Sequence, residues 1–316
     1  MLNRTIPVAF VGLCLNASCL LAFAHPGSGI VADASGDVYF SDTGHGIWKV
    51  TSDGAVSSPS QARGHFLAID PQGAFAQKHF SHLERDDVTV AARGPGLLVG
   101  TSYPITVGTD GAFYYPQVRG KGRVKLMRMP PGEKAQLFAE LPPAKEKSYT
   151  GEEVAAEWVW GMAAGPDGSI YYTEKHAVRK VAPDGKVSTA ADNVKVPDCE
   201  HPPAVTESHV EPGLYGIAVA DDGSVYVAAA ACSALLKIAP DGTVSVALRA
   251  TDGWSPQGVV VAGTTVYVLE YDYIKTDKRE DWLPRVRKLA PDGNVTVIAE
   301  IDPEARHAAA KSSRQQ

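Results

Sequence analysis

The sequence has few cysteines and only one long apolar run. Four cysteines occur among 316 residues, and two of them fall within the first 24. Outside that stretch no run reaches the roughly 18 to 20 apolar residues of a membrane-spanning helix, so no membrane partner is expected for the rest of the chain. Motifs of the G-x-S-x-G and H-E-x-x-H types and phosphate-binding glycine loops are also missing. Their absence removes the signatures of three common enzyme classes.

A surplus of basic residues is missing as well. Lysine and arginine number 30 against 36 aspartate and glutamate residues, a net charge of −6. Nucleic acid is therefore not expected as a partner, because its binding depends on basic side chains that neutralise phosphates. With 44% hydrophobic and 21% charged residues, the composition is that of a globular protein with a sizeable core.

The first 24 residues are typical of a cleaved export signal. Arg4 precedes an apolar run that ends in the small-x-small sequence Ala22-Phe23-Ala24. The alternatives are a retained membrane anchor and a lipoprotein anchor at Cys19. We therefore expect a periplasmic or secreted protein.

Only Cys199 and Cys232 remain after such a cleavage. An even number of cysteines in an oxidising compartment favours a disulfide between them, and two free thiols are the alternative. In the chain-entropy model the bridge would contribute roughly 3 to 4 kcal/mol to stability.

The rest of the sequence repeats one unit six times. Each copy has a short apolar run, a turn usually built on Asp-Gly, and a second run that alternates around tyrosine, which is the pattern of a tight hairpin. In most copies a third run and a second turn follow, as in VRKVAPDG and LLKIAPDG, and a fourth run completes the unit. The six copies begin with GIVADASGDVYFSD (29–42), FLAIDPQGAFAQKH (66–79), PITVGTDGAFYYPQ (104–117), GMAAGPDGSIYYTE (161–174), GIAVADDGSVYVAA (216–229) and GVVVAGTTVYVLE (258–270).

Units of about 40 residues with four antiparallel strands, repeated around a ring, predict an all-β, six-bladed β-propeller. The Pro-Asp-Gly turns and the G-[IV] start of the inner strands resemble those of the NHL-repeat family and of the SMP-30/gluconolactonase-like propellers, over residues 29–301. We expect a signal peptide at 1–24, the propeller at 25–301 and a weakly ordered tail at 302–316. Blades one and six each have their own strands, so the ring should close by packing of one on the other.

Strands alternate in direction within such a unit, so each first strand starts where each second strand ends. The long insertions fall at the same end of the ring, which we call the mouth, and long loops on one face often carry ligand contacts. The residues directly before the first strands form an inner ring: Ser28, His65, Tyr103, Trp160, Tyr215 and Gln257. The residues at the ends of the second strands form an outer ring: Asp42, His79, Gln117, Glu174, Ala229 and Glu270.

In the gluconolactonase-like families the inner-ring position supplies acidic and amide ligands to a catalytic divalent metal. The inner ring of this chain has no carboxylate, whereas calcium takes roughly six to eight oxygen ligands with carboxylates among them. A rearranged calcium or zinc site could instead combine Asp42, Glu174 and Glu270 with His65. Capping of strand ends is the alternative interpretation of these acids.

The mouth is also rich in aromatic residues: Tyr103, Trp158, Trp160, Tyr215, Trp254 and Trp282. Aromatic rings supply buried area in a pocket and polar groups fix the ligand's orientation, although the same rings could simply plug the channel. The predicted ligand-binding set is His65, Tyr103, Trp160, Tyr215, Gln257, Glu174 and Glu270. Two functions follow as hypotheses: an exported propeller that binds a small molecule or a protein at its mouth, or a metal-dependent lactonase or esterase of the gluconolactonase-like group.

Overall fold

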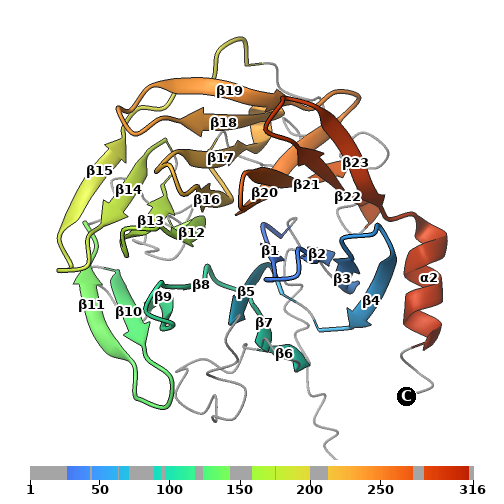
Figure 1. Cartoon of the computed structure of the whole chain (residues 1–316), viewed down its shortest axis with the longest axis horizontal. Helices are drawn as coiled ribbons and strands as arrows, with labels where there is room; N and C mark the ends of the chain where they lie inside the picture. The colour runs from blue at the N-terminus through green and yellow to red at the C-terminus, as the bar shows by residue number, and fades with distance from the viewer. Residues whose placement is uncertain are drawn as a thin grey trace, which may run out of the picture.

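The described chain forms six antiparallel sheets around a common axis (Figure 1). The computed structural model describes residues 27–42, 45–62, 64–70, 89–93, 97–117, 124–142, 159–174, 176–199, 213–272 and 281–312. Within these ranges five sheets have four strands and one has three. The predicted all-β propeller is confirmed, and the predicted signal peptide lies outside the described residues.

In five blades the strands follow one another from the axis outward. Blade one has β1 (Ile30–Ala32), β2 (Val38–Asp42), β3 (Gly46–Val50) and β4 (Val56–Ser60); blade three has β8 (Thr106–Val107), β9 (Phe113–Gln117), β10 (Lys125–Met129) and β11 (Gln136–Glu140); blade four has β12 (Gly161–Ala164), β13 (Ile170–Thr173), β14 (Val178–Val181) and β15 (Val187–Ala191); blade five has β16 (Ile217–Val219), β17 (Val225–Ala229), β18 (Ala234–Ile238) and β19 (Val244–Arg249); blade six has β20 (Trp254–Ala262), β21 (Thr265–Asp272), β22 (Pro284–Leu289) and β23 (Val295–Glu300).

Blade two departs from the predicted hairpin over residues 66–79. Its strands are β5 (Phe66–Asp70), β6 (Thr89–Arg93) and β7 (Leu97–Thr101), and β7 lies between the other two. The second strand of this blade is therefore Leu97–Thr101, which pairs with Phe66–Asp70. Three consecutive apolar residues of β7 are at most 2% exposed, because a middle strand must fill both faces of its sheet. His79 lies outside the described residues.

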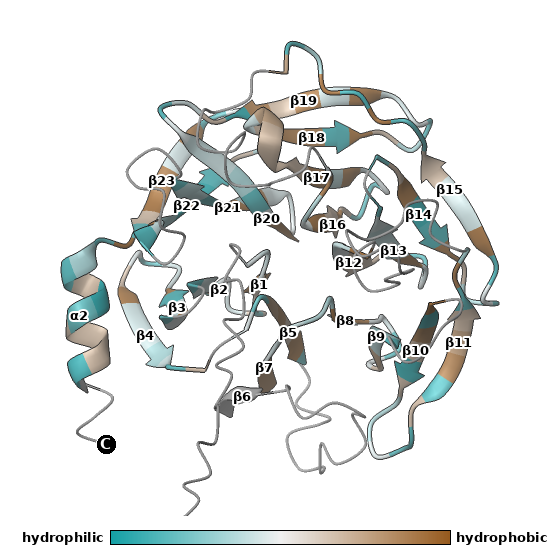
Figure 2. Ribbon diagram, turned by 180° about the vertical axis from the view of Figure 1, so that it is seen from behind, coloured by the Kyte–Doolittle hydropathy of each residue, from teal (hydrophilic) through white to brown (hydrophobic). Residues whose placement is uncertain are grey.

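The hydrophobic core lies between neighbouring blades. One cluster joins Tyr114 and Leu126 of blade three to Met162 and Tyr172 of blade four. Seen from behind, polar and apolar segments alternate along outer strands such as β19 (Figure 2), as expected for strands with one buried face.

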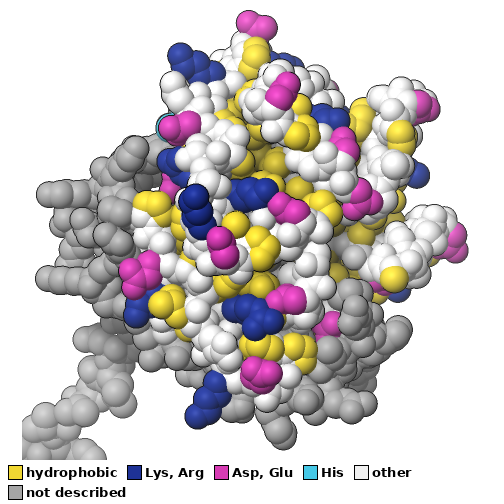
Figure 3. Space-filling view, turned by 60° about the vertical axis from the view of Figure 1, so that its left-hand side comes forward, with side chains coloured by type: hydrophobic (Ala, Val, Ile, Leu, Met, Phe, Trp, Pro, Cys, Tyr) yellow, Lys and Arg dark blue, Asp and Glu magenta, His cyan; other side chains and the backbone are white. Residues whose placement is uncertain are grey.

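The Asp-Gly turns gather at the end of the ring opposite the mouth, which we call the turn end. Gly111, Gly168 and Gly223 of these turns have φ between +74° and +80°, a region that side chains other than glycine rarely adopt. Aspartates of the turns pair with basic residues of the third strands, as in Lys180–Asp167 at 2.6 Å. Over the side of the molecule that includes blade four, basic and acidic side chains accordingly lie interspersed (Figure 3).

Blades one and six pack against each other, and a C-terminal helix lies beside them. Ile30 and Trp48 of blade one share a cluster with Tyr271 and Val286 of blade six. The tail expected to be weakly ordered instead forms helix α2 (Pro303–Ser312), whose half-buried alanines pack on the same cluster. Ala305 and Ala309 are four residues apart, so they lie on the same side of the helix and can be buried together.

Candidate functional site

The inner ring is held together by backbone contacts between neighbouring blades. The Gly29 amide donates a hydrogen bond to the His65 carbonyl at 2.8 Å, and the Gly216 amide donates one to the Gln257 carbonyl at 3.0 Å. Each contact joins the inner-strand glycine of one blade to the inner-ring residue of the next. These residues therefore lie side by side at one end of the ring, as the repeat predicts.

Close approach explains the glycine of the G-[IV] pattern. A Cβ added to Gly258 would lie 2.5 Å from the Ser28 carbonyl oxygen, across the closure between blades six and one. A Cβ added to Gly216 would lie 2.7 Å from the Gln257 carbonyl oxygen. Only glycine allows the inner strands to approach so closely.

Trp160 and Tyr215 form an aromatic pair in the inner ring. Their ring centroids are 5.2 Å apart with the planes at 68°, an edge-to-face arrangement. The Thr173 hydroxyl donates a hydrogen bond to the Tyr215 carbonyl at 2.8 Å, which ties blade four to blade five beneath the pair. Both rings are half-buried, so each keeps part of its surface open to a ligand.

The other inner-ring residues are unequally accessible. His65 and Ser28 are half-buried, whereas Tyr103 and Gln257 are 3% and 2% exposed. The tryptophans predicted to line the mouth differ in the same way: Trp254 and Trp282 are buried, and Trp158 lies outside the described residues.

Each acid of the outer ring is paired with arginine. In blade four, Arg179 Nε lies 2.8 Å from Glu174 Oε2. In blade six the side chain of Glu270 is fully buried and binds two arginines, with Arg285 Nε at 2.6 Å and Arg287 Nη2 on the other oxygen.

Asp42 of blade one obtains its arginine from helix α2. Arg306 contacts both oxygens of the carboxylate, at 2.8 Å through Nε and 2.6 Å through Nη2. The Trp48 indole donates a further hydrogen bond at 3.2 Å. Burial raises the pKa of Asp42, and the Arg306 guanidinium opposes that shift.

The predicted metal set is not assembled as a ligand group. Within the residues that the structure describes, no three His, Cys, Asp or Glu side chains come together in a way that could hold a metal ion. Asp42, Glu174 and Glu270 instead belong to three separate ion pairs in three blades. Their negative charge is compensated by guanidinium groups, which leaves little to attract a cation.

The arginine partners of these acids are residues at the mouth that sequence reasoning did not place there. Arg179 and Arg287 stand on third strands whose sequences, VRKV and RVRKL, carry basic residues that are typical of exposed positions. Only the cross-strand register shows that they turn toward the acids. Arg285 also stacks on Trp254, with its guanidinium carbon 4.0 Å from the ring centroid.

The predicted disulfide is present. Cys199 and Cys232 are bridged, which ties the segment before blade five to the turn between β17 and β18. Among the described residues no helix has the length and apolar character needed to cross a membrane.

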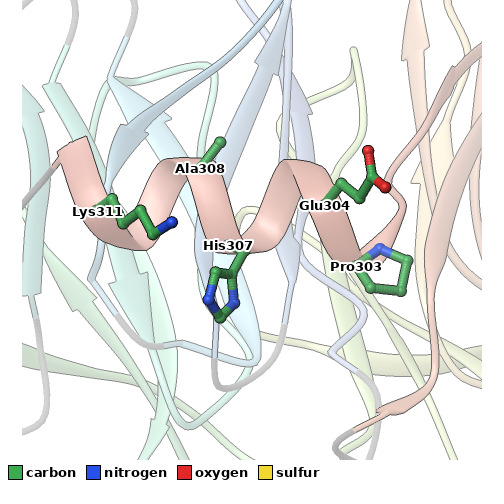
Figure 4. Close-up of a pocket in the computed structure, with 5 residues that line it drawn as sticks. All are labelled: Pro303, Glu304, His307, Ala308 and Lys311. Atoms are coloured by element: carbon green, nitrogen blue, oxygen red, sulfur yellow. The ribbon is translucent and has the colours of Figure 1, made fainter.

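Two surface hollows lie away from the inner ring. One runs along the exposed side of α2 (Figure 4) and is lined by Pro303, Glu304, His307, Ala308 and Lys311. The other lies between blades three and four at the turn end, with Tyr114, Arg128 and Phe138 among its walls.

Comparison with solved structures agrees with this architecture. An inactive variant of virginiamycin B lyase from Staphylococcus aureus, crystallised with quinupristin, has 15% sequence identity and a TM-score of 0.50, covering 90% of this chain and 88% of its own. A structural genomics protein of unknown function from Bacteroides thetaiotaomicron has 14% identity and a TM-score of 0.50, covering 78% of this chain and 66% of its own. A gluconolactonase from Xanthomonas campestris has 16% identity and a TM-score of 0.49, with coverage of 78% and 84%.

The chain has the fold of the six-bladed β-propellers. No protein-family model matches it, and no curated protein matches it in sequence. The two structures with a TM-score of 0.50 support the architecture alone, and the chemistry must be argued from the site itself.

Proposed function

We propose that this propeller binds a small, uncharged, ring-bearing molecule at its mouth. The observation that carries the proposal is the half-buried Trp160–Tyr215 pair, which offers two aromatic surfaces beside the axis. Aromatic surfaces of this kind stack on sugar rings and on planar molecules, and polar groups elsewhere in the inner ring, such as His65, would fix the orientation of such a ligand.

The charge distribution supports an uncharged ligand. None of the six inner-ring residues has a carboxylate, a lysine amine or a guanidinium. The carboxylates of the outer ring are paired with arginines in blades one, four and six. A charged ligand would find no free counter-ion among these residues and would lose hydration on binding.

The test is a binding screen with a matched pair of variants. Neutral oligosaccharides and neutral aromatic glycosides are titrated into the protein by calorimetry, together with uronic acids and amino sugars as charged counterparts. We expect binding of neutral members only, and Trp160→Ala should weaken it by about tenfold or more. Phe138→Ala is the control, because Phe138 is also half-buried and forms an edge-to-face pair with Tyr114, at 5.0 Å, but lies at the turn end.

Two results would contradict the proposal. One is equal binding by wild type and Trp160→Ala. The other is turnover of a lactone or ester that a chelator abolishes, which would favour the metal-dependent hydrolase instead. Glu174→Gln and Glu270→Gln would then be the variants to examine for loss of turnover.

We also propose that the protein is exported. The Cys199–Cys232 bridge supports this, because such bridges persist in oxidising compartments. Cell fractionation with mass spectrometry would test it: a chain found only in the cytoplasm, with residues 1–24 still attached, would contradict the proposal.

A further inference from the structure

Blades four and six share one arrangement around their outer-ring acids. Arg179 stands on β14 opposite Tyr172, the residue two positions before Glu174. Arg287 stands on β22 opposite Val268, the residue two positions before Glu270. In both blades the arginine at this third-strand position binds the acid of its own blade.

Blades without an outer-ring acid have no arginine at this position. Blade three ends its second strand in Gln117, and Met127 stands opposite Tyr115. Blade five ends its second strand in Ala229, and Leu236 stands opposite Val227. Acid and arginine therefore occur together or not at all within these four blades.

Blade one has the acid but not the arginine. Asp42 ends its second strand, and the third-strand residue opposite Phe40 is Trp48. The indole donates one hydrogen bond to Asp42 but carries no charge. A carboxylate with a fully buried side chain would be strongly destabilising without a compensating cation.

Arg306 supplies that cation from outside the blade, 264 residues along the chain from Asp42. Its guanidinium contacts both carboxylate oxygens, and Nη2 also donates a hydrogen bond to the Trp282 carbonyl at 2.5 Å. Trp282 lies two residues before the third strand of blade six. One side chain of α2 thus joins blade one to blade six.

We infer that Asp42, the Trp48 indole and the Trp282 carbonyl form a guanidinium-binding site at the junction of blades one and six, which Arg306 fills from within the same chain. The filled site holds α2 against the propeller and supplements the packing that closes the ring. A second contact crosses the same junction, because the Tyr271 hydroxyl donates to the Ser41 carbonyl at 2.6 Å. Emptying the guanidinium site should therefore weaken the junction without removing its apolar core.

The test is chemical rescue of the full-length Arg306→Ala variant. The substitution leaves a space of guanidinium size beside Asp42, and the melting temperature should fall by about 5 to 10 °C. Millimolar methylguanidinium should restore part of this loss by occupying the site. Sodium chloride or methylammonium chloride at equal ionic strength should restore less, because neither reproduces the bidentate contact.

Lys311→Ala is the matched control. It removes one positive charge from the exposed side of the same helix (Figure 4) and should leave the melting temperature unchanged. In Arg306→Ala, proteolytic removal of residues 303–312 should become faster than in the control, and methylguanidinium should slow it again.

A double variant keeps the inference testable if Arg306→Ala folds poorly. Asp42→Asn combined with Arg306→Ala removes both charges, so it should melt higher than Arg306→Ala alone. Rescue by sodium chloride as effective as rescue by methylguanidinium would overturn the inference. So would a double variant no more stable than the single one, or an equal loss in Lys311→Ala.

Discussion

The turn end and the mouth of the propeller differ in how closely the blades resemble one another. At the turn end, blades one, four and five each place an aspartate beside a lysine that lies over a tyrosine ring: Asp37, Lys49 and Tyr39; Asp167, Lys180 and Tyr171; Asp222, Lys237 and Tyr226. Blade three has an arginine in the same role, with Arg128 Nε 2.7 Å from Asp110. At the mouth, tyrosine is the only residue type that occurs twice among the six inner-ring positions.

The comparison distinguishes residues that the blades need for folding from residues that vary around the ring and are available for function. A group that recurs in blades one, three, four and five satisfies a demand that these blades share, here the closing of a tight turn beside a tyrosine. Four of the inner-ring residues, Ser28, His65, Tyr215 and Gln257, share a close backbone contact with a glycine of the neighbouring blade, but their side chains differ. Their variety is therefore unexplained by folding, which is why we place the ligand there.

The largest loss of stability should follow removal of the Cys199–Cys232 disulfide at the mouth. Replacement of both Cys199 and Cys232 by serine should lower the free energy of unfolding by about 3 to 4 kcal/mol, because the unfolded chain regains the entropy that the loop had lost. Denaturant unfolding measures this change. A reducing agent should destabilise the wild type and leave the double variant unaffected; equal stability of the two oxidised proteins would contradict the prediction.

A pair of glycine substitutions compares the two ends directly. Gly216→Ala places a Cβ 2.7 Å from both the Gln257 carbonyl oxygen and the Gly258 Cα, so the blades must move apart. We expect a loss of about 2 to 3 kcal/mol by denaturant unfolding. Gly54→Ala has no atom within 4 Å of the new Cβ but forces alanine to a φ of +90°, at a cost of about 1 to 2 kcal/mol. A larger loss at Gly54 than at Gly216 would show that close packing of the inner ring matters less than turn geometry.

The repeat predicted most of the architecture because each blade encodes its own strands locally. The positive φ of Gly111, the inner-strand position of Gly258 and the neighbouring inner-ring residues Trp160 and Tyr215 all follow from the register of the unit. The disulfide was predicted from the two cysteines that lie outside the expected export signal.

The features that the sequence did not predict depend on contacts distant in the chain. Blade two takes its second strand from residues 97–101, beyond an insertion, because the apolar run 97–99 fills a buried middle position better than a run that contains Gln77, Lys78 and His79 would. Arg306 reaches Asp42 from the opposite terminus of the propeller. The sequence near Arg306 gives no sign of this contact, because a solvent-exposed tail would also carry an arginine. The sequence near Asp42 gives no sign of it either.

The smallest loss of stability should follow removal of the Arg128–Asp110 ion pair at the turn end. Burial works to raise the pKa of Asp110, but hydrogen bonds from Arg128, the Ala112 amide and the Tyr114 hydroxyl together hold that pKa below its usual value. Asp110 therefore contributes stability above the pKa that it has in the unfolded chain, and this contribution is lost as pH falls through its lower folded pKa.

Arg128→Leu should raise the pKa of Asp110 and remove less than about 1 kcal/mol at neutral pH, since both side chains are about one-third exposed. The difference in stability between variant and wild type should shrink as the carboxylate is protonated in acid. NMR titration of Asp110 and unfolding at neutral and acidic pH measure both effects, with Lys134→Leu as a control that removes a charge from an exposed site in the same blade. A pKa of Asp110 unchanged in Arg128→Leu would mean that the recurring pairs do not set the electrostatics of the turns. Their repetition would then reflect packing of the aliphatic stems against tyrosine alone.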